Sequence, residues 1–193
     1  PDYPVLIEHF LEEAKEVDVD AISDGKETYI GGILEHVEHA GIHSGDSDCV
    51  WPAQKISKAL LQEIEETTHK LAVALKVKGL LNIQYALKDD KLYVLEVNPR
   101  ASRTVPFVCK ATGIPLVKLA IRLMLGESLA SLKPDIAEKP STHVAAKVPV
   151  LPFNKFKGAD PKLGPEMKST GEVMGIDTTF AMAYAKALIA SGM

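Results

Sequence analysis

The stretch LNIQYALKDDKLYVLEVNPRASR, residues 81–103, decides the fold of this chain. Within it, Leu81–Lys88 and Lys91–Asn98 each alternate apolar and polar side chains, and an Asp-Asp pair separates them. A period of two is typical of a strand with one buried face, and a short polar link between two such runs predicts an antiparallel hairpin. The sequence therefore predicts a β-hairpin whose second strand runs directly into a pair of arginines.

The register of this hairpin follows if both strands bury their apolar side chains on one face. These side chains are all odd-numbered: Leu81, Ile83, Tyr85, Leu87, Tyr93, Leu95 and Val97. Paired residue numbers must then add up to an even total, and a three-residue loop at 89–91 meets this condition. The register places Gln84 opposite Glu96 and Asn82 opposite Asn98, so we expect four polar side chains on the other face.

The end of the second strand carries the chemistry. Glu96 and Asn98 are two residues apart and share a face, and their oxygens are hard ligands of the type that Mg²⁺ prefers. Arg100 and Arg103 follow at once, and guanidinium groups bind phosphoryl or carboxylate groups through paired hydrogen bonds. The pattern indicates a site for a metal ion and a phosphate. A half-exposed amphipathic hairpin without any ligand would show the same alternation.

Composition limits the class of protein. The chain has 193 residues, of which 46% are hydrophobic and 25% charged, enough for one substantial core and a small second one. A net charge of −4 argues against a nucleic-acid surface, and no apolar run approaches the roughly 20 residues that span a bilayer. Cys49 and Cys109 match no paired metal-ligand spacing, so we expect reduced thiols and no disulfide.

Periodicity and turn residues predict the remaining elements. They are a hairpin from Glu16–Ser23 and Thr28–Val37, helices at Ser57–Lys76, Val105–Thr112, Leu116–Leu125 and Thr178–Ala190, a linker at Lys133–Thr142, a strand at His143–Val148 and a loop at Phe153–Gly171. The stretch Leu163–Gly175 has no chemistry that its residue types reveal, and we expect a loop packed against the core.

Several strings resemble one known family along essentially the whole chain. They are EVDVDAI at 16–22, AGIHSGDS at 40–47, NIQYA at 82–86, LEVNPRASRTVPFVCKATG at 95–113, LPFNKF at 151–156 and GPEMKSTGEVMG at 164–175. Together they resemble the large chain of carbamoyl phosphate synthetase, a member of the ATP-grasp superfamily. The TVPF and GPEMKSTGEVMG strings are similar to the second of its two homologous synthetase halves, the half that phosphorylates carbamate.

The resemblance implies an α+β fold of the ATP-grasp type, mainly an antiparallel sheet with flanking helices. Residues 1–126 would be the C-terminal part of the ATP-grasp domain, 127–142 a linker, and 143–193 a closing strand, loop and terminal helix of the same half. The chain starts without Met and runs at once into apolar residues, so we expect a fragment of a longer chain. It would lack the preceding glycine-rich segment that covers the ATP phosphates, and would be inactive alone.

The resemblance also implies site residues. Those for the nucleotide are His9, Leu11, Glu16, Gly41, Ile42, His43, Ser44, Gln84 and Glu96. Gln84, Glu96 and Asn98 would hold Mg²⁺ or Mn²⁺, while Arg100, Arg103 and Asn98 would act on the transferring group. Without the resemblance, Glu16 would be one exposed charge among several and the glycine-rich loop at 41–47 a simple connection. The family also uses K⁺, whose ligands the sequence does not identify.

The implied activity is ATP- and Mg²⁺-dependent phosphorylation of carbamate to carbamoyl phosphate, a cytoplasmic ligase reaction in pyrimidine and arginine biosynthesis. The implied partners are the rest of the large chain, a small glutamine amidotransferase subunit, ATP and carbamate, with neither nucleic acid nor membrane. Two alternatives stay open. One is another ATP-grasp carboxylate-amine ligase or carboxylase, and the other is a folded fragment that is catalytically silent alone.

Overall fold

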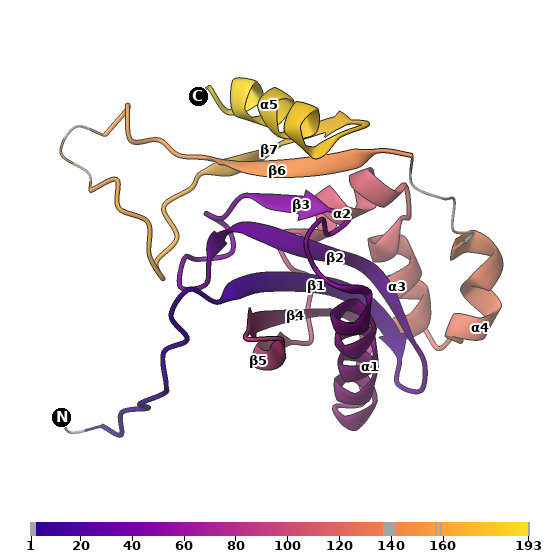
Figure 1. The fold of residues 1–193 in the computed structure, drawn as a ribbon. Coiled ribbons are helices and arrows are strands. Elements are labelled where there is room, and N and C mark those ends of the chain that lie inside the picture. Colours follow the sequence, from indigo (N-terminus) through magenta and orange to yellow (C-terminus); the bar gives the residue numbers. More distant parts are fainter. Residues whose placement is uncertain (1–2, 137–141, 157, 159, 193) are drawn as a thin grey trace.

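The chain folds around one seven-stranded antiparallel sheet with helices on both faces (Figure 1). The structure, a computed structural model, describes residues 3–136, 142–156, 158 and 160–192. In chain order the elements are β1 (Lys15–Asp24), β2 (Thr28–His39), β3 (Cys49–Trp51), α1 (Lys58–Ala74), β4 (Lys78–Lys88), β5 (Lys91–Asn98), α2 (Val105–Thr112), α3 (Leu116–Met124), α4 (Leu129–Leu132), the 3₁₀ helix η1 (Lys133–Ile136), β6 (Val144–Val150), β7 (Gly171–Asp177) and α5 (Phe180–Ser191). The predicted antiparallel sheet with flanking helices is confirmed.

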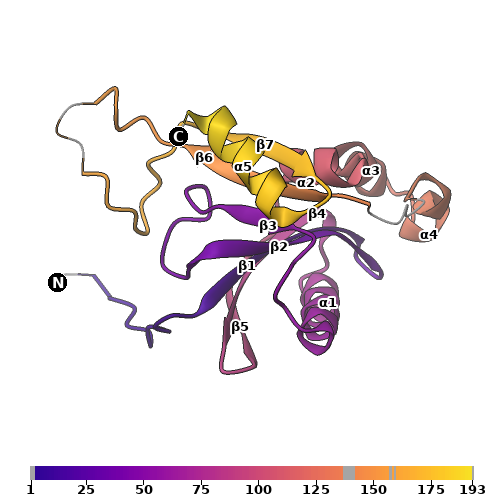
Figure 2. The ribbon, with the colours of Figure 1, turned by 45° about the horizontal axis from the view of Figure 1, so that its top comes forward.

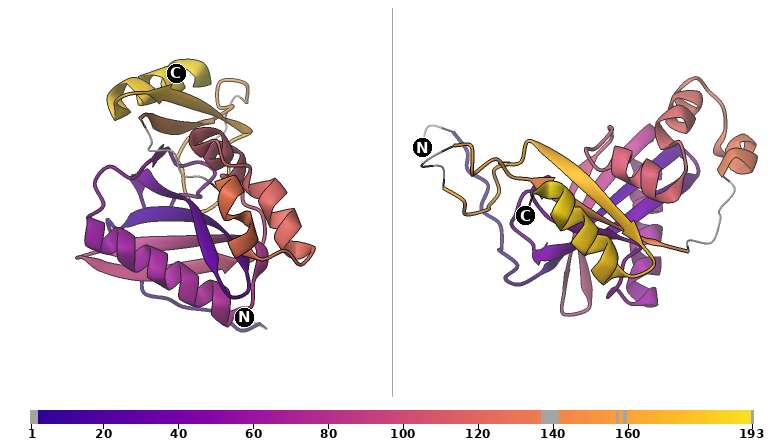
Figure 3. Two further views of the ribbon diagram at one scale, coloured as in Figure 1. Left: turned by 90° about the vertical axis from the view of Figure 1, so that its right-hand side faces the viewer. Right: turned by 90° about the horizontal axis from the view of Figure 1, so that it is seen from above.

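The strand order is β5-β4-β1-β2-β3-β6-β7. Helix α1 covers one face of the central strands, and α2 to α4 pack on the opposite face (Figure 3). Odd-numbered residues of β1 and β4, such as Val19 and Ile83, join Ile64 of α1 in one core. Helix α5 packs on β6 through Ala183 and Ala187, which forms a third, smaller core. The sheet is thus buried on both faces over most of its length.

The even-numbered face of β1 and β4 changes character along the strands. At one end Ile22 and Leu80 are packed with Leu116, Leu119 and Leu123 beneath α3 and its neighbours. Toward the other end the same face carries acidic and amide side chains, Glu16, Asp18, Asp20, Asn82 and Gln84. Because apolar helices cannot cover such groups cheaply, this polar end is where a ligand site is expected.

The predicted pairing of β4 with β5 is confirmed next to the site and is wrong at the turn. Asn82 pairs with Asn98 and Gln84 with Glu96, as the sequence predicts. The turn, however, contains only Asp89 and Asp90, both with positive φ (51° and 56°), and Lys88 pairs with Lys91. Two-residue turns of this kind match the twist of the strands, and Asp tolerates the left-handed conformation better than most residues.

A bulge in β5 reconciles the short turn with the predicted pairs. Gln84 pairs with Glu96, but Tyr85 pairs with Val94, so β5 holds one extra residue at this point. As a result Leu92 joins the core beneath α1, whereas Tyr93 and Leu95 are 36% and 47% exposed. The prediction that Tyr93 and Leu95 face the core is therefore wrong.

Two further elements differ from the sequence prediction. Strand β7 pairs with β6 over its whole length, from Val144 opposite Asp177 to Val150 opposite Gly171. Its sequence GEVMGID has two glycines and only weak alternation, a pattern that does not predict a strand. The linker predicted at 133–142 begins with η1 and follows α4, and Ile136 is buried in the core; residues 137–141 lie outside the described part of the chain.

Both cysteines are free thiols, with Cys49 buried and Cys109 half-buried. Among the helices of the described residues, none has the length and apolar character to cross a bilayer. Residues 3–10 form neither helix nor strand and extend away from β1, at the end of the chain marked N in Figure 2.

Gly175 of β7 lets α5 approach the sheet backbone. A Cβ at this position would lie 2.0 Å from the carbonyl oxygen of Ala183 and 2.7 Å from the nitrogen of Ala187, both backbone atoms of α5. We therefore expect Gly175→Ala to lower the free energy of unfolding by about 1–3 kcal/mol or more, measured by urea denaturation. The matched control on the same strand is Gly171→Ala, where a Cβ meets nothing within 4 Å. Equal stability of the two variants would contradict this packing.

Candidate functional site

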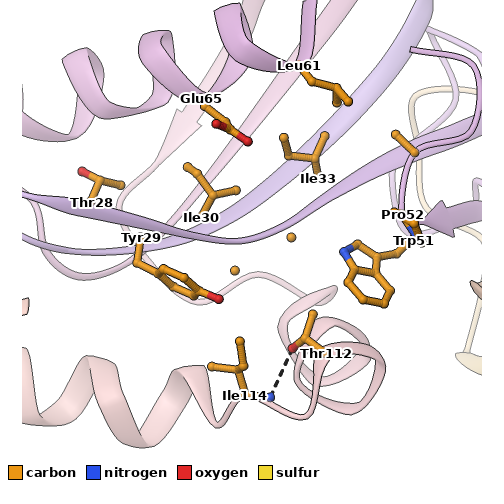
Figure 4. A pocket seen from close by; sticks show the side chains of 13 residues that line it. Thr28, Tyr29, Ile30, Ile33, Trp51, Pro52, Leu61, Glu65, Thr112 and Ile114 are labelled. Carbon is orange, nitrogen blue, oxygen red and sulfur yellow. Dashed lines mark hydrogen bonds between the residues drawn. The ribbon is translucent and has the colours of Figure 1, made fainter. Parts of the chain in front are cut away.

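A cavity of about 200 Å³ lies over the polar end of the sheet. Its walls come from β1, β4, β5, β6 and β7, the loop at 41–47 and the turn that leads into α2. They are Asp18, His43, Ser44, Gly45, Asn82, Gln84, Glu96, Arg100, Ser102, Arg103, Thr104, Lys147 and Glu172. A larger cavity of about 640 Å³ follows the first half of β2 between α1 and the α2–α3 junction (Figure 4). None of the predicted site residues lines that larger cavity.

A hydrogen bond from β4 reaches the loop at 41–47, and two others join neighbouring side chains at the end of β5. The Nε2 atom of Gln84 donates to the Oγ atom of Ser44 at 3.3 Å. On β5, the Nδ2 atom of Asn98 donates to Oε1 of Glu96 at 2.5 Å, and Nη2 of Arg100 donates to Oδ1 of Asn98 at 3.2 Å. The carboxylate, the two carboxamides and one guanidinium predicted from the sequence are therefore brought together.

The oxygen atoms of these side chains are suitable ligands for a hard divalent cation. Among the described residues, no three His, Cys, Asp or Glu side chains gather as a metal site. A metal ion at Glu96 would rely on one carboxylate and the amide oxygens of Gln84 and Asn98, with remaining positions for water or phosphate. That is the usual pattern for Mg²⁺, which keeps few protein ligands. The amide oxygens can turn toward a cation because carboxamide orientation follows the surrounding hydrogen bonds.

The loop at 41–47 is held from both sides. Gly41 has a φ of +108°, a conformation that glycine adopts readily, and the Gly45 amide donates to Nδ1 of His43 at 3.0 Å. The carboxylate of Asp46 accepts hydrogen bonds from the amides of Lys168 and Ser169, at 2.7 and 2.9 Å. Although burial raises the pKa of Asp46, these hydrogen bonds bring it below its usual value.

The stretch 163–175 packs against this loop rather than forming a site of its own. The amide of His43 donates to the carbonyl of Gly164 at 2.8 Å, and the Ser169 hydroxyl donates to the carbonyl of Gly45 at 3.1 Å. Met167 contacts the guanidinium of Arg103. Residues 163–170 form a loop, as predicted, which packs against the loop at 41–47, while 171–175 belong to β7.

Asp20 anchors the arginine-bearing turn to the sheet. Its buried carboxylate accepts hydrogen bonds from the hydroxyls of Ser102 and Thr104, both at 2.6 Å, and from Nδ2 of Asn82 at 3.0 Å. Burial raises the pKa of Asp20 to about 6, against the opposing effect of these hydrogen bonds. Because Ser102 and Thr104 flank Arg103, Asp20 determines where that guanidinium can reach.

A buried pair of ionisable side chains, His36 and Asp18, lies next to the cavity. Nε2 of His36 and Oδ2 of Asp18 are 3.1 Å apart, and both side chains are almost fully buried. Burial lowers the pKa of His36, but its contacts with Cys49 and Asp18 outweigh this and raise the pKa well above its usual value. Burial also raises the pKa of Glu16, although the charge of His36 and a hydrogen bond from the Gly41 backbone oppose the rise. Burying these ionisable side chains of β1 and β2 next to the cavity therefore costs free energy.

The predicted site residues divide into three groups. His43, Ser44, Gln84, Glu96, Arg100 and Arg103 line the cavity. Asn98, Glu16 and Gly41 adjoin it through the contacts given above. His9, Leu11 and Ile42 do not line it: His9 is exposed in the segment before β1, and Leu11 and Ile42 are half-buried.

The sequence prediction missed other lining residues, among them Asp18, Thr104 and Lys147. A signal was present for Lys147, the only charged residue in the apolar run VAAKVPV of β6. Asp18 and Asp20 alternate with valines in EVDVDA, where charged side chains normally face solvent, so their burial could not be inferred from the pattern alone.

Comparison with known proteins identifies the family. The family model described as "Carbamoyl-phosphate synthase L chain, ATP binding domain" matches residues 2–132, which is more than half of the chain. The chain belongs to this family. A carbamoyl phosphate synthase large chain from Archaeoglobus fulgidus is 60% identical over 100% of this chain and 18% of its own length. That from Methanothermobacter thermautotrophicus is 57% identical over the same shares, 100% and 18%. The chain thus spans about a fifth of these carbamoyl phosphate synthase relatives.

Solved structures of two carboxylases have a fold similar to that of this chain. A biotin carboxylase domain of a single-chain bacterial carboxylase matches with a TM-score of 0.64 and 18% identity, over 86% of this chain and 43% of that one. The urea carboxylase of Kluyveromyces lactis matches with a TM-score of 0.70 and 16% identity, over 92% of this chain and 18% of that one. At these identities the likeness concerns the fold alone, and the expected ATP-grasp type is confirmed.

The buried Asp20 makes stability depend on pH. Its pKa is about 6 in the fold and near 3.8 in an unfolded chain, so its contribution to stability is largest below about pH 3.8 and is lost as the pH rises through about 6. Asp20→Asn remains neutral throughout. We expect the difference in unfolding free energy between variant and wild type to move in favour of Asp20→Asn, by on the order of 3 kcal/mol, between about pH 4 and pH 7.

The measurement is urea denaturation at a series of pH values, with the exposed Asp160→Asn as control. A difference between Asp20→Asn and wild type that stays constant with pH would show that Asp20 ionises as a solvated carboxyl does.

Proposed function

We propose that, within a complete large chain, this domain binds ATP with Mg²⁺ and phosphorylates carbamate to carbamoyl phosphate. The observation that carries the proposal is the convergence of Gln84, Glu96 and Asn98 with Arg100 and Arg103 beside one glycine-containing loop. Family membership supports the use of ATP by this domain. The rest of the activity is our inference, since the chain spans only part of its relatives.

In this proposal the residues bind and position rather than transfer protons. Gln84, Glu96 and Asn98 would hold Mg²⁺ or Mn²⁺, and the bound metal would supply positive charge to the phosphates of ATP. Arg100 and Arg103 neutralise the carbamate and the transferring phosphoryl group. A carbamate oxygen attacks the γ-phosphorus, and the bond from this phosphorus to the β–γ bridging oxygen breaks, so that ADP leaves. The attacking oxygen is already anionic, and the site therefore needs no general base.

Other residues in and around the cavity would bind the nucleotide. Gly41, Ile42, His43 and Ser44 follow the phosphates, and Glu16 accepts hydrogen bonds from the ribose hydroxyls. The adenine lies against His9 and Leu11, which do not line the cavity in this structure.

A monovalent cation, K⁺, completes the cofactor proposal. We propose no ligands for it.

The remaining parts of the proposal concern the whole protein. Residues 1–126 complete an ATP-grasp domain with the rest of the large chain, 127–142 connect it to the closing part at 143–193, and a small glutamine amidotransferase subunit supplies nitrogen. The pathway is pyrimidine and arginine synthesis in the cytoplasm. We expect the isolated chain to make no carbamoyl phosphate, because a nucleotide covered on one side only is not shielded from water. A different ATP-grasp carboxylase function is less well supported, since those structural likenesses are below 20% identity.

Glu96→Gln tests the metal assignment in the complete large chain. The substitution keeps the volume and removes the negative charge, so we expect the fold to persist and carbamate phosphorylation to fall by on the order of 10²-fold or more. The assay measures carbamoyl phosphate formed from supplied carbamate and ATP. Glu63→Gln, an exposed glutamate on α1, is the matched control and should keep wild-type turnover. Wild-type turnover in Glu96→Gln would refute the metal assignment.

A further inference from the structure

Lys147 is the one lysine that the described structure buries completely, with 0% of its surface exposed. It lies near the middle of β6, where it pairs with Cys49 of β3 on one side and Met174 of β7 on the other. Its side chain lines the 200 Å³ cavity. Holding a lysine in such a position is costly, because an ammonium group loses its hydration and fixes a flexible side chain.

The protein compensates this ammonium only in part. Nζ donates one hydrogen bond, to the carbonyl oxygen of Ser44 at 3.2 Å, although an ammonium has three hydrogens to donate. Within the described residues, no carboxylate lies within 4 Å of Nζ. Burial raises the pKa of Asp48 and of Glu172, and the charge of Lys147 opposes both rises, so these carboxylates sense the ammonium from further away.

Because Lys147 lines the cavity, a ligand bound there is a source of acceptors for the remaining hydrogens of Nζ. The other lining cations are Arg100 and Arg103, and His43 belongs to the same loop as the carbonyl that Lys147 binds. Ser44 links the two sides, because its hydroxyl accepts from Gln84 of β4 while its carbonyl accepts from Lys147 of β6. A small anion in this space would meet positive groups from opposite walls. Two donors of Lys147 would then find oxygen acceptors without moving the strand.

We propose that Lys147 is an anion-binding residue of this site, which contacts an anionic oxygen of the ligand, from either a phosphoryl or a carboxylate group. This inference deepens the proposed function, because it assigns a third cation to the reacting groups from the wall opposite the arginines. It also explains why the 41–47 loop is bonded to β6 through a backbone carbonyl. In this proposal the ammonium group of Lys147 binds both the carbonyl oxygen of Ser44 and the anion.

The test uses the 193-residue chain with inorganic phosphate and bicarbonate as separate probes, in the absence of nucleotide and metal. Binding is followed by two-dimensional NMR titration and by the rise in the midpoint of thermal unfolding. We expect at least one of the two anions to bind the wild type. In Lys147→Met the dissociation constant of that anion should rise at least tenfold. Lys147→Arg should retain part of the binding, and Lys118→Met, on the exposed surface of α3, should match the wild type. Phosphate alone would indicate a phosphoryl subsite, and bicarbonate alone a carboxylate subsite.

Stability without anion separates this role from a structural one. Replacing a buried, poorly paired charge by an apolar side chain of similar length is commonly neutral or stabilising, so Lys147→Met should unfold at the same or a higher urea concentration than the wild type. A structural lysine predicts the opposite, with lower stability and unchanged anion binding, and that result would overturn the proposal. So would a wild type that binds neither anion.

A failure of the proposed function would look different. The anion titrations contain neither nucleotide nor metal, so they do not depend on the metal ligands or on turnover. Anion binding that is retained in Lys118→Met and lost in Lys147→Met supports the role of Lys147, whether or not the complete enzyme phosphorylates carbamate.

Discussion

The pairing of Gln84 with Glu96 across β4 and β5 is the constraint on which the rest of the site depends. A shift by one residue would send Glu96 to the face beneath α1 and bring an apolar side chain to the cavity. The turn alone, with two residues, would impose that shift. The extra residue of β5 near Leu95 absorbs it, so a tight turn and a correctly placed carboxylate coexist. The bulge is therefore a functional feature of the hairpin, and its cost is the exposure of Tyr93 and Leu95.

The second constraint is the burial of ionisable side chains on one face of the sheet. Asp18, Asp20, His36 and Lys147 are each at most 1% exposed, and they lie on or beside a cavity of only about 200 Å³. The Asp20 carboxylate accepts three hydrogen bonds, whereas within the described residues Nδ1 of His36 has no hydrogen-bond partner and Nζ of Lys147 has one. Buried polar groups that a fold leaves incompletely paired reduce its stability. Their concentration at one end of one face is what a preorganised binding site requires, since these groups need not rearrange when a charged ligand arrives.

Much of this arrangement could be predicted from the sequence because the strands alternate cleanly. Parity requires paired residue numbers with an even sum, and a loop of three residues selects the pairs Asn82 with Asn98 and Gln84 with Glu96, which the structure contains because the bulge adds the residue that the turn lacks. The turn itself could not be predicted, because two- and three-residue loops fit the same Asp-Asp-Lys string and only the bulge distinguishes them. Strand β7 was missed because its pairing with β6, rather than its own side chains, stabilises it. The burial of Asp18, Asp20 and Lys147 depends on loops at 41–47 and 102–104 that are distant in sequence.

We propose above all that Gln84, Glu96 and Asn98 form a metal site beside the loop at 41–47. Paramagnetic Mn²⁺ broadens the NMR signals of the groups that it approaches, and the broadening is visible even when binding is weak. With a non-hydrolysable ATP analogue and substoichiometric Mn²⁺, the side-chain amide signals of Gln84 and Asn98 should disappear first. The amides of Gln54 and Gln62, which lie outside the cavity, should remain sharp. Equal broadening of all four amides, or earlier loss of Gln54 and Gln62, would contradict the account.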